Sequence, residues 1–108
     1  MTTSILAQAE RLREFATSVL QKLGMPSSHA DDAANVLVWA SLRGVDTHGV
    51  RNLERYYVDG VIDGTINPQP NFRVEFETPI SARVDGDRGN GLAAASWGMR
   101  LAIKKAVE

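Results

Sequence analysis

The sequence predicts a mixed α/β protein of the α+β type: an amino-terminal three-helix segment, two short strands and a closing helix. Two observations lead to this prediction. Apolar residues first recur every three or four positions, which is the period of a helix with one buried face. From residue 72 the pattern changes to alternation, which is typical of strands, and a glycine-rich turn then precedes a last helical stretch.

Composition places the chain among ordinary globular proteins of one domain. It has 108 residues, of which 44% are hydrophobic and 23% charged, and its net charge is -1. That charge gives no electrostatic reason to bind nucleic acid. The absence of cysteine excludes disulfides and thiolate metal sites, and no apolar run approaches the roughly 18 residues of a membrane span. We therefore expect a cytoplasmic protein with no nucleic-acid or membrane partner.

The first helix is expected from about Ile5 to Leu23, because its apolar residues form one continuous stripe. Thr3 or Ser4 would cap its start, and Gly24 would end it. This stripe indicates a core-facing helix rather than a cofactor site.

A second helix is expected to begin after Pro26 and to run to Arg43. Ser28 and Asp31 have the spacing of a capping box. The apolar residues of this helix should pack against those of the first helix.

An acidic and histidine-containing cluster, made of His29, Asp31 and Asp32, lies at the start of this second helix. The two carboxylates are better explained by the positive end of the helix dipole than by a metal. Even with His48 added, the set lacks a third strong ligand. We expect no metal site.

A break between the second and third helices precedes His48. Gly44 suits the left-handed residue that ends a helix, and Asp46 or Thr47 could cap a new one over about residues 47–58. This reading places His48 in the first turn of the third helix.

Arg51 and Arg55 follow His48 at intervals of three and four residues, so one helical face could carry an imidazole and two guanidiniums. Such a face could hold a carboxylate while the imidazole handles a proton. Gly49 would leave room beside the ring for a ligand or a neighbouring backbone. The alternative is a solvated face on which Arg55 pairs with Asp59.

Turn signals at Asp59-Gly60 and Asp63-Gly64 follow the third helix. Two half-buried strands joined around Thr78-Pro79 come next, since apolar and polar residues alternate on both sides of it. The alternating apolar residues are Phe72, Val74, Phe76, Ile80, Ala82 and Val84.

The glycine-rich segment 85–91 connects the second strand to a helix over about residues 92–107. A turn between strand and helix can bind phosphate through helix-terminal N–H groups. Here the glycine order lacks a phosphate-loop signature, and two acidic residues would repel an anion. A structural turn is therefore favoured over a nucleotide site.

The run from Leu42 to Val50, with the later Tyr56-Tyr57, Gly60 and the stretch 64–68, resembles the malate/L-lactate dehydrogenase family, which includes sulfolactate and ureidoglycolate dehydrogenases. The likeness covers nearly all 108 residues. It implies a non-Rossmann oxidoreductase fold that exchanges a hydride between NAD or NADP and a small 2-hydroxy or 2-oxo acid.

The resemblance also implies roles for single residues. His48 would be the acid and base, and Thr47 would help to orient it. Family members usually carry an arginine four residues after the histidine, where this chain has Asn52 directly after Arg51. The substrate-binding candidates are therefore Arg51, Asn52 and Arg55.

The helical pattern continues to Glu108 without a terminal cap. We therefore expect a single amino-terminal segment of a longer dehydrogenase, mainly helical over 1–70 and strand-strand-helix over 71–108. Cofactor-binding residues would lie mostly beyond Glu108, the full-length enzyme would be a homodimer, and the segment alone would be inactive. The alternative is a non-enzymatic helical module for dimerisation or partner binding.

Overall fold

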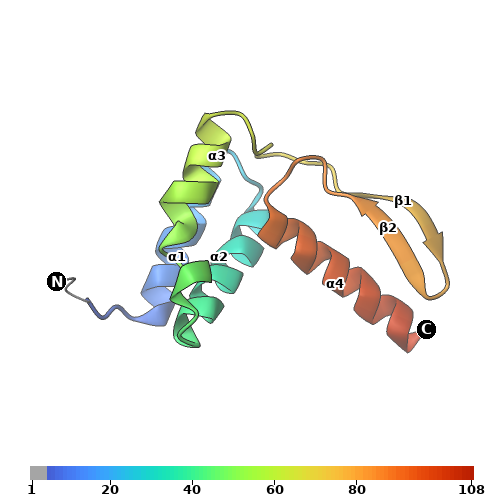
Figure 1. Ribbon diagram of the computed structural model, residues 1–108, viewed down its shortest axis with the longest axis horizontal. Helices are drawn as coiled ribbons and strands as arrows, with labels where there is room; N and C mark the ends of the chain where they lie inside the picture. Colours follow the sequence, from blue (N-terminus) through green and yellow to red (C-terminus); the bar gives the residue numbers. More distant parts are fainter. Residues whose placement is uncertain (1–4) are drawn as a thin grey trace.

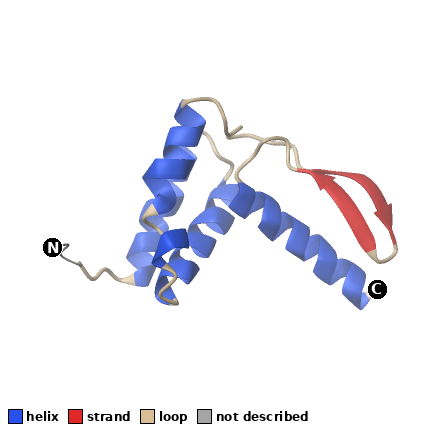
Figure 2. Ribbon diagram, viewed as in Figure 1, coloured by secondary structure: helices blue, strands red, loops and turns tan. Residues whose placement is uncertain are grey.

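The computed structural model describes residues 5–108 (Figures 1 and 2). In chain order the elements are α1 (Ala9–Lys22), α2 (Ser27–Leu42), a 3₁₀ turn (Asp46–His48), a π-helical segment (Leu53–Val58), α3 (Asp59–Ile62), β1 (Arg73–Thr78), β2 (Ser81–Asp85) and α4 (Gly91–Val107). The predicted fold class, with helices first, then two strands and a closing helix, is confirmed. No helix in the described range has the length and apolar character needed to cross a membrane.

The elements form two regions. The helical body contains α1, α2 and the helical residues 46–62, and the arm contains β1, β2 and α4. Figure 1 shows the arm extending to one side of the body, with the carboxyl terminus near its outer end. The radius of gyration is 15.1 Å, against about 13 Å for a compact domain of about 100 residues. Much of the arm therefore lies away from the core.

The core of the body lies between α1 and α2, so the predicted packing of the first two helices as a pair is confirmed. Leu20 of α1 and Leu37 of α2 are its largest fully buried side chains. Small residues around them let the helix backbones approach closely. The core residues are Ala16, Leu20, Met25, Ala30, Ala33, Ala34, Leu37 and Leu53.

The first helix begins at Ala9, so the predicted start at Ile5 is wrong. Ile5 and Leu6 precede the helix and are 89% and 98% exposed. A helical turn that buries no side chain is marginal in water, which explains why the helix starts later. The predicted cap at Thr3 or Ser4 lies outside the described residues.

Gly24 ends α1 with a φ of +100°, as the sequence indicates. The capping box predicted for Ser28 and Asp31 is wrong, because the first turn of α2 has no side-chain cap. Pro26 occupies the cap position with a ψ of 149°, and it has no side-chain oxygen to accept a hydrogen bond. Ser28 already lies inside the helix.

The third helix does not run continuously from Thr47, and this prediction is wrong. Residues 46–48 form a 3₁₀ turn, and Gly49 then has extended backbone with φ −98° and ψ −155°. Helical structure resumes as the π-helical segment and continues into α3. His48 therefore precedes the helix instead of occupying its first turn.

The turn predicted at Asp59-Gly60 is also wrong, because both residues lie in α3. Gly60 is buried, and a Cβ there would approach Ile66 Cδ1 to 2.4 Å. The missing side chain lets the chain fold back, with the Ile66 N–H donating to the Gly60 carbonyl at 2.9 Å. The predicted turn at Asp63-Gly64 is confirmed by a Gly64 φ of +86°.

The two predicted strands form an antiparallel hairpin. Val74 pairs with Val84 and Thr78 with Ser81, and the register shifts between Val74 and Phe76. The expected half-burial is wrong for most of both strands, since Phe76 is 59% exposed. The hairpin packs mainly on α4 through β2.

Side-chain contacts join the arm to the body at several points. The His29 ring of α2 stacks on Phe72 at 4.6 Å between centroids, and Phe72 lies 6.0 Å from Trp97 of α4. Arg100 of α4 donates two hydrogen bonds to the Asp32 carboxylate, at 3.2 and 2.6 Å. An aromatic stack and a bidentate ion pair thus add to the packing of Leu92 of α4 against the core of the body.

Candidate functional site

The Thr47–His48 pair lies on the 3₁₀ turn directly after α2. Gly44, with a φ of +76°, lets the chain leave the helix. The Val45 N–H then donates to Ala40 O at 3.0 Å, and the His48 N–H donates to Val45 O at 3.1 Å. The turn is thus built on the end of a helix whose inner face forms the core.

Thr47 and His48 point toward each other and are both exposed. Thr47 Oγ1 lies 2.9 Å from His48 Nδ1, which is a hydrogen bond in which either atom can donate. Nδ1 is the ring nitrogen with a hydrogen-bond partner among residues 5–108. Nε2 is therefore the nitrogen open to a ligand.

The backbone on both sides of His48 is held by side chains. Ser41 Oγ accepts the Val50 N–H at 3.0 Å, and the Asn52 side-chain amide donates to Thr47 O at 2.8 Å. Gly49 is buried against Ser41. Of the two neighbours expected beside this glycine, a ligand or a backbone, the structure has the second: the side chain and backbone of Ser41 fill the space.

The two predicted arginines do not share a helical face with His48, because Gly49 interrupts the helix. Arg51 lines an open groove that also includes Phe15 and Val19 of α1, and His48 is not among its lining residues. The Arg55 guanidinium lies 5.8 Å from the centre of the Tyr56 ring. Hydrogen bonds thus bring Thr47, His48 and Asn52 together, and neither arginine takes part in them.

Burial raises the pKa of the Tyr57 phenol, so this side chain stays neutral at physiological pH. The described range contains no group of three His, Asp or Glu side chains able to hold a metal ion. The His29 ring stacks on the Phe72 ring, a contact that does not involve His48.

The glycine-rich segment is occupied by internal hydrogen bonds. The Asp87 carboxylate accepts the Asn71 N–H at 2.9 Å, and the Asn90 side chain caps α4 by accepting from Leu92 and Ala93. A Cβ on Gly89 would lie 2.5 Å from Pro70. The Leu92 and Ala93 N–H groups of α4 are thus already bonded, which disfavours a cofactor phosphate at this helix start.

Sequence reasoning assigned no role to Ser41 or to the Trp39–Arg43 pair. The Arg43 guanidinium lies 3.3 Å from the centre of the Trp39 ring, a cation–π contact beside the site. The Trp39–Arg43 contact could have been predicted from the sequence, because residues four apart share a helix face. The hydrogen bond between Ser41 and Val50 forms only because the chain reverses between them, so no local sequence pattern predicts it.

Comparison with solved structures places this fold among dehydrogenases. The structure of malate dehydrogenase from Pyrococcus horikoshii matches with a TM-score of 0.90 and 48% identity, over 95% of this chain and 29% of that chain. Because the match includes nearly the whole chain at this identity, it covers both the helical body and the arm. The described fold is thus that of one part of a dehydrogenase subunit.

Sequence comparisons identify the family. Malate dehydrogenase from Pyrococcus horikoshii is 50% identical over 97 residues, which are 90% of this chain and 27% of that protein. Ureidoglycolate dehydrogenase (NAD(+)) from Escherichia coli is 38% identical over 97 residues, 90% of this chain and 28% of that protein. The sequence profile of malate/L-lactate dehydrogenase matches residues 7–108. The chain belongs to this family and spans little more than a quarter of the length of these relatives.

Proposed function

We propose that this chain is the part of an NAD(P)-dependent 2-hydroxyacid dehydrogenase, of the malate/L-lactate kind, that carries the acid–base histidine. The observation that supports this most is the hydrogen-bonded Thr47–His48 pair on an exposed turn, in a chain that belongs to the family. The names of two relatives give malate and ureidoglycolate as their substrates, and both compounds are 2-hydroxy acids.

His48 would move the proton that accompanies the redox step. Oxidation of a hydroxyl requires a base, and Nε2 can accept its proton if Nδ1 carries a hydrogen and donates to Thr47 Oγ1. In the reverse direction the protonated Nε2 donates to the developing alkoxide. Thr47 thereby fixes both the ring orientation and the nitrogen that faces the substrate. The bound nicotinamide supplies the hydride chemistry.

The substrate carboxylate would be bound by Arg51 and Arg55. Both guanidiniums are exposed and available to a planar carboxylate, which they can hold through two parallel hydrogen bonds. Arg51 also borders the groove over α1, which offers an apolar wall. The Asn52 side-chain amide donates to Thr47 O, which favours a role other than binding the substrate carboxylate.

The cofactor is proposed to be NAD or NADP. The name of the ureidoglycolate relative specifies NAD(+) for that protein. The glycine-rich segment of this chain is filled by its own hydrogen bonds, so we assign no cofactor contact to it. The whole enzyme is proposed to be a cytoplasmic homodimer, as the family resemblance implies.

The test joins residues 7–108 of this chain to the part of Pyrococcus horikoshii malate dehydrogenase that the match does not cover. We expect this joined protein to oxidise NADH or NADPH in the presence of oxaloacetate, and the 108-residue chain alone to show no turnover. A folded joined protein without 2-oxo acid reduction would contradict the assignment, as would turnover by the chain alone.

A further inference from the structure

Ser41 holds the turn that carries His48 from the side of α2. Its Oγ accepts the Val50 N–H at 3.0 Å, across nine residues of sequence. A Cβ built on Gly49 would lie 2.1 Å from Ser41 Oγ and 3.2 Å from the Ser41 backbone nitrogen. The residue directly after His48 is therefore pressed against the last turn of α2, and no side chain fits between them.

Asn52 holds the same turn from the other side. Its side-chain amide donates to Thr47 O at 2.8 Å, while its own backbone N–H donates to Gly49 O at 3.0 Å. The amide thus bridges the peptide before His48 to the start of the π-helical segment. Short π-helical segments within helices are frequent at functional sites.

We propose that Ser41 and Asn52 are positioning residues that fix the Thr47–His48 pair, and that Asn52 serves this purpose instead of binding the substrate carboxylate. Two exposed side chains on a three-residue turn have no packing of their own to hold them. Fixing the backbone on both sides holds Thr47 Oγ1 within hydrogen-bond reach of Nδ1. The catalytic consequence rests on the proposed function, whereas the structural one does not.

The first test uses the 108-residue chain labelled with ¹⁵N-histidine and observed by NMR. In the unchanged chain, the His48 ring should show one dominant tautomer. In Ser41→Ala and in Asn52→Ala we expect the tautomer ratio to move toward that of a free histidine, because the turn is released. Exchange of the Val50 amide should accelerate about tenfold in Ser41→Ala alone, since it loses its acceptor.

Ser18→Ala and Asn35→Ala serve as matched controls, because both residues are exposed on their helices. They should leave the ring signals unchanged. Ring signals identical to those of the unchanged chain in both Ser41→Ala and Asn52→Ala would overturn the proposal. So would an unchanged chain whose ring already samples both tautomers freely.

The second test measures the joined protein. Ser41→Ala and Asn52→Ala should each lower kcat by roughly 10- to 100-fold, the scale for a misplaced catalytic group, and leave KM within about twofold. If both residues act through His48, the same substitutions in a His48→Ala background should cost nothing further. An additional loss there would overturn the positioning role, and a raised KM with normal kcat in Asn52→Ala would restore Asn52 as a substrate ligand.

The two proposals fail in different ways. If His48→Ala itself leaves kcat unchanged, the proposed acid–base function fails, while the ring signals still decide whether Ser41 and Asn52 fix the turn. If His48→Ala greatly lowers kcat but Ser41→Ala and Asn52→Ala behave as their controls do, only the positioning proposal is lost.

Discussion

The helical body and the arm bury their apolar residues to different extents. In the body, leucine and alanine side chains from α1 and α2 close a core with fully buried members. In the arm, β2 and α4 face each other across an open cleft of about 300 Å³. From this difference in burial we expect stability to come mainly from the body, to which the turn bearing His48 is attached.

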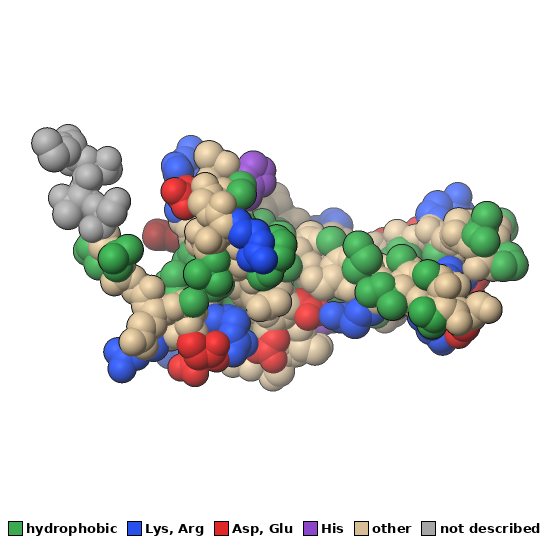
Figure 3. Space-filling model, turned by 90° about the horizontal axis from the view of Figure 1, so that it is seen from below, with side chains coloured by type: hydrophobic (Ala, Val, Ile, Leu, Met, Phe, Trp, Pro, Cys, Tyr) green, Lys and Arg blue, Asp and Glu red, His purple; other side chains and the backbone are tan. Residues whose placement is uncertain are grey.

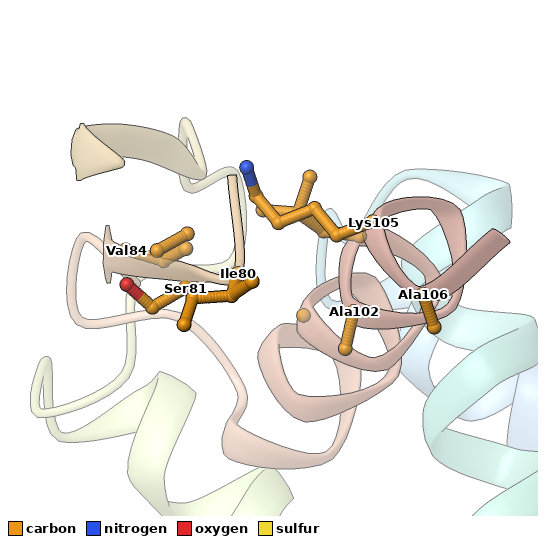
Figure 4. A pocket seen from close by; sticks show the side chains of 9 residues that line it. Ile80, Ser81, Val84, Ala102, Lys105 and Ala106 are labelled. Atoms are coloured by element: carbon orange, nitrogen blue, oxygen red, sulfur yellow. The ribbon is translucent and has the colours of Figure 1, made fainter. Parts of the chain in front are cut away.

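Figure 4 shows how the cleft of the arm is built. Ile80, Ser81 and Val84 lie on the hairpin side, and Ala102 and Ala106 lie opposite on α4. Its walls are mostly apolar, and Figure 3 shows apolar side chains gathered over the outer end of the arm among Lys and Arg. The hairpin is held to α4 partly by polar contacts, such as Lys105 Nζ to Glu77 at 2.8 Å.

The largest expected difference comes from truncating one leucine in each region. Leu37→Ala removes a fully buried side chain from the body and should lower the free energy of unfolding by about 2–5 kcal/mol. Leu101→Ala alters the open cleft and should cost less than about 1.5 kcal/mol, because little cavity is created. Urea unfolding followed by circular dichroism measures both. Equal losses would remove the distinction between body and arm.

Two glycines sharpen the comparison within the arm. Gly89→Ala places a Cβ 2.5 Å from the rigid Pro70 ring, so it should destabilise the chain by about 1–3 kcal/mol. Gly98→Ala adds a Cβ that meets nothing within 4 Å, inside α4. It should stabilise the chain by about 0.5–1 kcal/mol, because alanine favours the helix. Thermal melting of both variants should show shifts of opposite sign, and shifts of the same sign would refute this packing.

The junction between body and arm gives a smaller effect. His29 Nδ1 is buried without a hydrogen-bond partner, although the ring stacks on Phe72. His29→Phe keeps the stacking and removes the unpaired polar atom, so stability should rise by about 1 kcal/mol. A loss of stability in urea unfolding would show that Nδ1 contributes a contact, and His29→Ala provides the control that removes the ring.

The smallest effect is the pH dependence that Asp85 of the arm contributes. The Asp87 N–H and then Arg73 hold the pKa of Asp85 below its ordinary value of 3.8. A carboxylate with a lowered pKa in the folded state stabilises the fold above the unfolded value. That stability is lost as the pH falls below about 3.8 and through the folded pKa. Asp85→Asn should reduce this loss of stability when the free energy of unfolding is measured between pH 5 and about 2. An unchanged loss of stability at low pH would show that other carboxylates cause it.

Local patterns predicted the elements that depend on local chemistry. The apolar period and Gly24 gave the α1–α2 pair, and the alternation after Phe72 gave the hairpin. The break after His48 was missed because it depends on Ser41 meeting Gly49 through space. The exposure of Phe76 was missed because alternation shows which residues share a face and not what covers that face.

In the candidate site too, local sequence patterns predicted some features, and contacts through space decided the others. Thr47 and His48 were identified from their motif, and the structure joins them by a hydrogen bond. The shared face with Arg51 and Arg55 assumed a continuous helix, which Gly49 interrupts. Spacing in sequence therefore located the pair but not its neighbours.

We propose above all that His48 transfers the proton in hydroxyacid oxidation. The most direct test of this claim is kcat for the joined protein with His48→Ala, measured with and without added imidazole. We expect kcat to fall by about 10²- to 10⁴-fold and to recover in part when imidazole is supplied. A kcat within a few-fold of the unchanged joined protein would contradict the claim.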